Sequence, residues 1–379
     1  MAQLTDDCFA FDGPLIAVDE ARQLLMARVR PIAAAETVPL FEAVGRVLAE
    51  DVVAERAVPP YDNSAVDGYA VYADDLAAEG ETTLPIGGRV AAGHPLGRPQ
   101  RRGEAVQIFT GAPMPDGADG AGGPDTVMML EDARIEGERV VLPAGLKRGS
   151  NRRSAGEDVA PEARVLSAGT RLSPPDVGML AAVGRSAAPG FKPLTVALFS
   201  TGDEVRDPGT ELPDGALYDS NRFTIGAALR ALGLRVHDLG ILQDSEPVIQ
   251  AAMAEAAESA DAVLSTGGMS MGEEDHVRAG IERLGRLAFW RIAIKPGRPV
   301  GMGMLPDGRG GHTPFVGLPG NPVAAVTTFI ALARPLLLRL QGATDGEPRR
   351  HPVRLGFAYE KKSGRREYVR ARLAAQDPA

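Results

Sequence analysis

The fold is decided by the stretch 193–268, which reads PLTVALFS (193–200), SNRFTIGAALRALG (220–233), RVHDLGIL (235–242), PVIQAAMAEAAESA (247–260) and DAVLSTGG (261–268). The short apolar runs are typical of buried strands, whereas the longer segments have helical spacing. Ser220 is expected to cap the first helix and Gly233 to end it. Repeated strand–helix–strand units predict a mostly parallel α/β sheet.

The same alternation extends from this stretch in both directions. It continues with a helix in EEDHVRAGIERLG (273–285), strands in WRIAIK (290–295), PVGMGML (299–305) and PFVGLPG (314–320), and a helix in NPVAAVTTFIALARPLLLRL (321–340). Before it, SPPDVGMLAAVG (173–184) begins a helix, with Ser173 as cap, Pro174 in the first turn and Asp176 at the positive end of the helix dipole. In such sheets the ligand lies beyond the carboxyl ends of the strands.

The remaining chain has different patterns. Residues 14–30 have the apolar spacing of one amphipathic helix, and residues 51–146 consist of short apolar runs between Gly and Pro, as in a compact β domain. HPVRLGFAYEKK (351–362) and REYVRARL (366–373) resemble a β hairpin. We therefore predict a multidomain α/β protein, and its expected parts are a discontinuous helical linker domain (1–50 and 147–172), an inserted β-rich domain (51–146), an α/β domain (173–340) and a short C-terminal β segment (341–379).

Composition excludes several classes of protein. The 379 residues carry 41 Lys and Arg against 50 Asp and Glu, a formal net charge of −9, which argues against general affinity for nucleic acid. The single Cys8 cannot form an intramolecular disulfide, in agreement with a reducing cytoplasm. The first 20 residues lack the pattern of a signal peptide, and no apolar run reaches the length that spans a bilayer. We expect a soluble cytoplasmic protein that binds neither nucleic acid nor membranes.

Three predicted strands end in polar loops that contain glycine. These loops are Ser200-Thr201-Gly202-Asp203-Glu204, Ser265-Thr266-Gly267-Gly268 and Gly317-Leu318-Pro319-Gly320-Asn321-Pro322. Glycine lets backbone amides approach an anion, and a following helix N-terminus adds positive potential, so each loop suits a phosphate. A single loop of this kind is more often a plain strand-to-helix connection, but three at one sheet edge favour a binding site.

Charged residues surround these loops. Glu204 and Asp244 follow strand ends, as do Glu273, Glu274 and Asp275, and Lys295-Pro-Gly-Arg298 places two cations across a turn. Clustered carboxylates beside cations suit a hard divalent ion held together with an oxyanion. The alternative is a solvated charged rim.

Two further polar segments lie outside the α/β domain. PPYDNSAVDGYA (59–70) is a polar turn that leads into a strand expected to carry Asp67, and NRRSAGED (151–158) places two arginines before an acidic pair. Taken alone, Asp67 is more often a turn-forming residue and Arg152 a surface cation.

Together these segments resemble the molybdopterin molybdenumtransferase family, the MoeA-like enzymes related to the E domain of gephyrin. The resemblance covers residues 14–340 and rests on nine stretches in the family's order: PPYDNSAVDGYAV, IFTGAPMPDGAD, NRRSAGEDV, SPPDVGMLAAVG, STGDEV, YDSNRF, STGGMSMGEEDHV, IKPGRPVGMG and GLPGNPVAAV. It implies a transferase that inserts molybdate into adenylated molybdopterin, releases AMP and uses Mg²⁺. Because the pterin's dithiolene receives the metal, no protein cysteine is required.

The resemblance also implies roles for individual residues. The implied catalytic residues are Asp67, Thr110, Asp158, Glu204, Lys295 and Arg298. The implied binding residues are Ser265, Thr266, Gly267, Gly268, Ser270, Gly272, Pro319, Gly320, Asn321 and Pro322, and the implied Mg²⁺ ligands are Asp244 and Asp275. Cations and loop amides would bind the anionic substrates, whereas the two aspartates would hold the cation.

The sequence departs from the family at two points. Arg298 stands where the family commonly has Lys, and the chain stops at Ala379 before a Gly/Ser-rich turn that completes the family's C-terminal β domain. Two hypotheses follow: an active homodimeric transferase, with the β domain of one subunit facing the α/β domain of the other, or a non-catalytic molybdopterin-binding scaffold. A molybdopterin adenylyltransferase activity would leave residues 1–170 without a role, although such an enzyme is an expected partner.

Overall fold

The computed structural model describes residues 15–118, 122–268, 276–297, 299–348, 350–361 and 363–372. The chain divides into two compact units. Unit 1 comprises residues 1–50, 167–177 and 187–379, and unit 2 comprises residues 51–166 and 178–186. The β-rich segment is therefore inserted into the sequence of the α/β unit.

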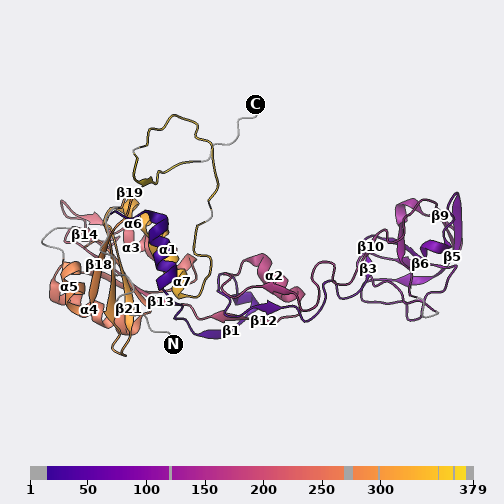
Figure 1. The fold of residues 1–379 in the computed structure, drawn as a ribbon, viewed down its shortest axis with the longest axis horizontal. Coiled ribbons are helices and arrows are strands. Elements are labelled where there is room, and N and C mark those ends of the chain that lie inside the picture. The colour runs from indigo at the N-terminus through magenta and orange to yellow at the C-terminus, as the bar shows by residue number, and fades with distance from the viewer. Residues whose placement is uncertain are drawn as a thin grey trace. The chain divides into compact units, whose positions relative to one another are not determined.

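Unit 1 is built on a six-stranded sheet (Figure 1). Its strands, in spatial order, are β16 (Arg235–Leu242), β13 (Thr195–Thr201), β17 (Ala262–Thr266), β21 (His312–Leu318), β20 (Pro299–Pro306) and β18 (Arg286–Arg291). The first four are mutually parallel, whereas β20 is antiparallel to both β21 and β18. The sheet is therefore mixed.

The antiparallel pairing has a local cause. Asp307 begins the turn between β20 and β21, and its Oδ1 accepts hydrogen bonds of 2.8 Å from the backbone N–H groups of Arg309 and Gly311. A turn of this length joins only antiparallel neighbours.

Helices cover both faces of the sheet (Figure 1). One face holds α1 (Val18–Arg28), α3 (Asn221–Ala231), α6 (Pro322–Thr328) and α7 (Arg334–Leu340), and the other holds α4 (Glu246–Ser259) and α5 (His276–Leu284). A π turn, Phe329–Ala333, joins α6 to α7. The combined helix Pro322–Leu340 is long and apolar enough to cross a membrane, but 72% of its most apolar window is buried inside the protein, as in a core helix.

Smaller pairings complete unit 1. β1 (Ala35–Pro39) is antiparallel to β12 (Ala187–Phe191), and a short 3₁₀ turn, Leu40–Glu42, follows β1. Two parallel pairs are β14 (Val205–Arg206) with β15 (Leu217–Tyr218) and β19 (Ile294–Lys295) with β22 (Arg366–Glu367).

The hairpin expected near the C-terminus is wrong for the described residues 351–372. The only strand among these described residues is β22, which pairs in parallel with β19 rather than with a neighbouring strand of the tail. The apolar side chains of this segment pack poorly, because Val353, Leu355, Phe357 and Val369 are between 53% and 62% exposed. A two-stranded hairpin without such packing gains little stability in water, which explains its absence.

Unit 2 contains a second six-stranded sheet, which confirms the β-rich character expected for this part of the chain. Its spatial order is β7 (Thr126–Met129), β4 (Gly68–Val71), β6 (Ala105–Ile108), β5 (Glu81–Val90), β9 (Arg139–Pro143) and β8 (Arg134–Glu136). Alternate residues pack on opposite faces: Tyr69 and Val71 belong to one apolar cluster, and Ala70 and Val106 belong to another.

Shorter elements make up the rest of the described secondary structure between residues 51 and 182. They are β2 (Val52–Val53) paired with β11 (Arg164–Leu166), β3 (Asn63–Ser64) paired with β10 (Arg152–Arg153), and the 3₁₀ turns Ala73–Asp75 and Leu130–Asp132. The helix α2 (Pro174–Ala182) begins as expected after Ser173.

Two expected helix caps differ in detail. The Asp176 carboxylate accepts bonds from the Ser173 N–H at 2.8 Å and the Ser173 hydroxyl at 2.6 Å, so Ser173 acts as the donor. At α3, the Ser220 side chain makes no capping bond, and Asp219 instead accepts from the N–H of Arg222 at 3.0 Å. Aspartate is as good an N-cap acceptor as serine, and the sequence DSNR offers both.

Candidate functional site

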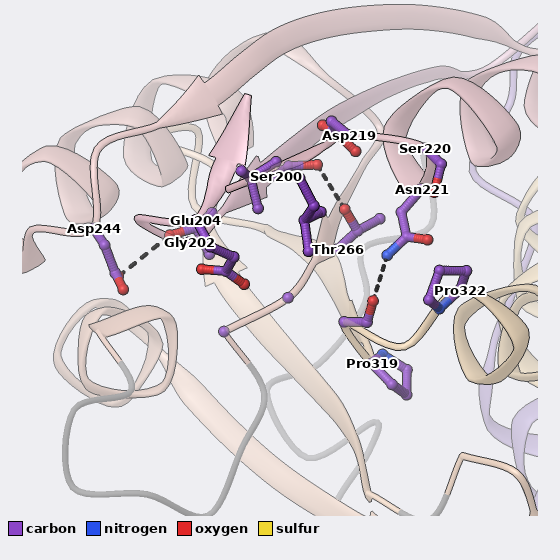
Figure 2. A pocket seen from close by; sticks show the side chains of 16 residues that line it. Ser200, Gly202, Glu204, Asp219, Ser220, Asn221, Asp244, Thr266, Pro319 and Pro322 are labelled. Carbon is purple, nitrogen blue, oxygen red and sulfur yellow. Dashed lines mark hydrogen bonds between the residues drawn. The ribbon is translucent and has the colours of Figure 1, made fainter. Parts of the chain in front are cut away.

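A cavity of about 530 Å³ opens at the carboxyl ends of β13 and β17. These strands are neighbours, but the chain leaves β13 for β16 on one side and then returns to β17 on the other. This is the topological switch point at which α/β sheets bind ligands. The cavity is lined by Ser200, Thr201, Gly202, Glu204, Val205, Leu217, Asp219, Ser220, Asn221, Asp244, Thr266, Gly267, Gly268, Pro319, Gly320 and Pro322 (Figure 2).

Three hydrogen bonds join the walls of the cavity (Figure 2). The hydroxyls of Ser200 and Thr266 lie 2.6 Å apart and link β13 to β17. The Thr201 hydroxyl donates to Asp244 Oδ1 at 3.2 Å, and Asn221 Nδ2 donates to the Gly320 carbonyl oxygen at 2.7 Å. The three predicted loops therefore meet at one site.

The Gly267–Gly268 turn requires glycine. Both residues have positive φ, +90° and +63°. A Cβ on Gly267 would lie 2.8 Å from the Thr201 carbonyl oxygen, and one on Gly268 would lie 2.3 Å from Val277 Cγ2. The Gly267 N–H donates to the Leu318 carbonyl at 3.1 Å, so the amide predicted to bind an anion is already engaged at this residue. In this turn, the predicted anion contact therefore rests on Gly268.

The other predicted binding residues divide into three groups. Thr266, Pro319, Gly320 and Pro322 line the cavity with the two glycines. Ser265 is fully buried and Asn321 caps α6, accepting from Val323 and Ala324 N–H at 3.1 Å, so neither lines the cavity. Ser270 and Gly272 lie outside the described residues.

Two of the predicted charged residues, Glu204 and Asp244, line the cavity. Lys295 does not, and its Nζ lies 3.3 Å from the carboxylate of Glu367, a partner that the sequence pattern did not reveal. Hydrogen bonding by Tyr359, followed by that of Lys295, lowers the pKa of Glu367 below its usual range although desolvation opposes this. Arg298 and Asp275 lie outside the described residues, as do Glu273 and Glu274.

The described residues at the cavity offer few side-chain oxygen atoms that could coordinate a hard cation together. Within the described ranges, no group of three or more His, Cys, Asp or Glu side chains converges in a way that could hold a metal ion. Asp244 provides one carboxylate at the cavity wall, with a threonine hydroxyl bonded to it.

The predicted residues of unit 2 form two separate contacts. Asp67 Oδ1 accepts from the Thr110 backbone N–H and from the Thr110 hydroxyl, each at 2.8 Å, and these two bonds lower the pKa of Asp67. Asp158 is bound by Arg153, whose Nη2 lies 2.7 Å from both carboxylate oxygens. Arg152 forms an ion pair with Asp62. Asp67 and Thr110 are thus brought together, as a pair distinct from Asp158.

Sequence reasoning missed one wall of the cavity. Asp219, Ser220 and Asn221 line it at the start of α3, where the pattern suggested only a helix cap. Three consecutive polar residues before a helix, at the carboxyl edge of a sheet, are a signal that could have identified them.

The chain matches two family models that together cover most of its length. The MoeA N-terminal region (domain I and II) matches residues 16–184, and a probable molybdopterin binding domain matches residues 197–339. The second match includes all the residues that line the cavity described above.

Curated relatives and solved structures agree with these models. The molybdopterin molybdenumtransferase of Haemophilus influenzae is 37% identical over 94% of this chain and 85% of its own length. Molybdopterin molybdenumtransferase 2 of Mycobacterium tuberculosis is 34% identical over 93% of this chain and 85% of its own length. The crystal structure of the molybdopterin biosynthesis moeA protein of Pyrococcus horikoshii OT3 is 31% identical, with a TM-score of 0.72 over 88% of this chain and 81% of that one.

Proposed function

The chain belongs to the molybdopterin molybdenumtransferase family, and we propose that it inserts molybdate into adenylated molybdopterin and releases AMP. The observation that carries this proposal is the cavity at the switch point of the α/β sheet, within the part of the chain that matches the molybdopterin-binding model. The backbone amide of Gly268 in the loop 266–268 suits a phosphate, and Glu204 and Asp244 line the same space.

In this proposal the side chains of the cavity bind and orient an anionic substrate. Asn221 fixes the Gly320 loop, and the hydroxyls of Ser200 and Thr266 keep the ends of two strands together. Lys295 and Arg298 are proposed to hold molybdate, and Asp67, Thr110 and Asp158 of unit 2 are proposed to take part in the reaction. Their support is the family resemblance of their sequence segments.

Mg²⁺ fits the donor chemistry of Asp244, because this ion is commonly held by one or two carboxylates together with substrate phosphates. Asp244 and Asp275 are the residues that would hold it, and the bound ion would supply charge neutralisation at the phosphoanhydride. The Thr201 hydroxyl would orient the Asp244 carboxylate through its 3.2 Å bond.

The assembly and location of the protein also remain part of the proposal. A homodimer, a molybdopterin adenylyltransferase as partner and a cytoplasmic location are supported by the family resemblance. Sedimentation of the purified chain, alone and with that partner, measures the first two.

The test of the function is direct. The purified chain is incubated with adenylated molybdopterin, molybdate and Mg²⁺, and AMP and molybdenum-loaded pterin are measured. We expect both products in equal amounts. A chain that binds the pterin without releasing AMP would instead be the non-catalytic scaffold.

Asp244→Asn tests the proposed metal ligand in the same assay. We expect lower turnover and a higher Mg²⁺ requirement with the fold retained, because a carboxylate at a cavity wall contributes little to the core. Glu255→Gln on α4 is the matched control, since Glu255 is exposed and away from the cavity. Wild-type turnover of Asp244→Asn would remove Asp244 from the metal site.

A further inference from the structure

A buried arginine lies behind one wall of the cavity. Arg222, in the first turn of α3, is 6% exposed and contacts three carboxylates. Its Nε lies 3.1 Å from Asp219 Oδ2, its Nη1 lies 2.7 Å from both oxygens of Asp238, and its Nη2 pairs with Asp207. The fork of the guanidinium therefore has a carboxylate on each side.

These contacts join three separate segments of unit 1. Asp207 lies between β14 and β15, Asp219 lies just before α3, and Asp238 belongs to β16. Backbone bonds reinforce the arrangement, because the N–H of Leu217 donates to the Glu204 carbonyl and that of Asp219 donates to the Arg206 carbonyl, both at 2.8 Å. The two ends of the segment 204–221 are consequently bonded to each other and, through Arg222, to Asp238 of the sheet strand β16.

The segment that Arg222 holds is a wall of the cavity. It provides Glu204, Val205, Leu217, Asp219, Ser220 and Asn221 to the lining (Figure 2). Arg222 itself is not part of the lining. Any effect of this arginine on a bound substrate is therefore exerted through the residues of the wall.

The charge balance makes Arg222 hard to replace. The side chain of Asp219 is only 2% exposed, so without the cation it would be a buried carboxylate close to two others. Lysine would keep the charge but presents a single ammonium, which cannot bind carboxylates on three sides in the planar geometry of a guanidinium. Burial alone would lower the pKa of Arg222, but the bonds to Asp238 and Asp219 raise it above its usual value.

We propose that Arg222 is a positioning residue for the reaction of this site, which holds the wall 204–221 so that Glu204 and Asn221 face the substrate. This inference rests on the proposed function for its kinetic consequence, but not for its structural one. The two consequences can be measured separately.

The kinetic experiment compares Arg222→Lys and Arg222→Gln with the wild-type chain. We expect kcat/KM for adenylated molybdopterin to fall by about 10²-fold in Arg222→Gln, the scale of a 1 Å misplacement in an active site. Arg222→Lys should recover part of this loss, because it restores the charge but not the fork. Ile249→Ala is the control for stability, since Ile249 is a fully buried residue of the core on the α4 side of the sheet. The inference is overturned if Ile249→Ala, at an equal loss of thermal midpoint, lowers kcat/KM as much as Arg222→Gln does.

The structural experiment needs no substrate. Hydrogen exchange is measured at the backbone amides of Leu217 and Asp219, which bond within the wall, and at those of α4 as a reference. Both Arg222 variants should speed exchange at Leu217 and Asp219 and leave exchange in α4 unchanged. Ile249→Ala should speed exchange in α4 and leave Leu217 and Asp219 unchanged. Unchanged protection at Leu217 and Asp219 overturns the positioning role. If the wall loosens as expected while the wild-type chain neither binds the pterin nor forms AMP, then the proposed function is wrong and the structural role of Arg222 stands.

Discussion

At the residue scale, Asp67 is held by two donors that can be separated by mutation. The backbone N–H of Thr110 and then its hydroxyl lower the pKa of Asp67 below its ordinary value, which is about 3.9 for aspartate. Thr110→Val removes only the hydroxyl, so we predict a partial rise of the Asp67 pKa toward that value. A carboxyl NMR titration of the full chain measures it.

The sign of the effect and its control follow from the two bonds. A carboxylate with a lowered pKa keeps its charge, and the stability that depends on it, until the pH falls through the lowered value. The Thr110→Val protein should therefore begin to protonate Asp67 at a higher pH than the wild type. Thr110→Ser keeps the hydroxyl and should titrate like the wild type. An Asp67 pKa that is equal in all three proteins would show that the hydroxyl does not bond to it.

Individual site residues could be predicted only where chain position determines their surroundings. Thr266 is the last residue of β17, Glu204 and Asp244 lie just beyond the ends of β13 and β16, and parallel strands bring such residues to one edge. Asn321 follows a strand end too, but its side chain binds two backbone amides of α6 instead. Lys295 meets Glu367, which is 72 positions away, and no local pattern specifies a contact at that separation.

At the scale of elements, α6 depends on its cap. Asn321 Oδ1 accepts from two amides that are otherwise unpaired at a helix N-terminus, so Asn321→Ala should lower the free energy of unfolding by about 0.5–2 kcal/mol. Asn321→Asp retains an acceptor and should lose little of this stability. Denaturant unfolding of the three proteins measures the difference. Equal midpoints for Asn321→Ala and the wild type would mean that water replaces the cap without cost.

Helices and strands could be predicted from the sequence where their hydrophobic pattern was long. The strands and helices between residues 195 and 284 follow the expected alternation, because each apolar run is long enough to identify its period. The hairpin predicted for the tail was wrong, because β22 has only two residues and its partner β19 lies in a distant part of the chain. The π turn Phe329–Ala333 interrupts an apolar helix pattern that shows no break in the sequence.

At the scale of the whole molecule, Asp19 of α1 binds the C-terminal tail to the α/β unit. It accepts from Arg366 Nη1 at 2.8 Å and from Arg350 Nη2 at 3.1 Å, and the Arg366 bond is the main reason that its pKa lies far below the usual range. Asp19→Asn should therefore speed hydrogen exchange at the amides of Arg366 and Tyr368, which bond to Ala293 and Lys295. Glu20→Gln, a change to an exposed neighbour on the same helix, is the control.

The pH dependence of this attachment has a definite sign. Because the folded-state pKa of Asp19 is lowered, its contribution is fully present above the unfolded value near 3.9 and is lost as the pH falls below it. The difference in hydrogen-exchange rate at Arg366 and Tyr368 between Asp19→Asn and the wild type should be largest near neutral pH and should become smaller in strong acid. Equal exchange at neutral pH would show that β22 alone holds the tail.

The insertion of unit 2 has a consequence for synthesis on the ribosome. The helix α1 ends at Arg28, but its core partners include Leu336 and Leu340 of α7, and the backbone N–H of Ile32 bonds to the Leu340 carbonyl. About 310 residues separate Arg28 from Leu340. At ~5–20 residues per second, the apolar face of α1 emerges about 15–60 s before α7 is made. During that interval the nascent N-terminal segment is a natural client for chaperones, whereas unit 2 is complete once residue 186 has been made.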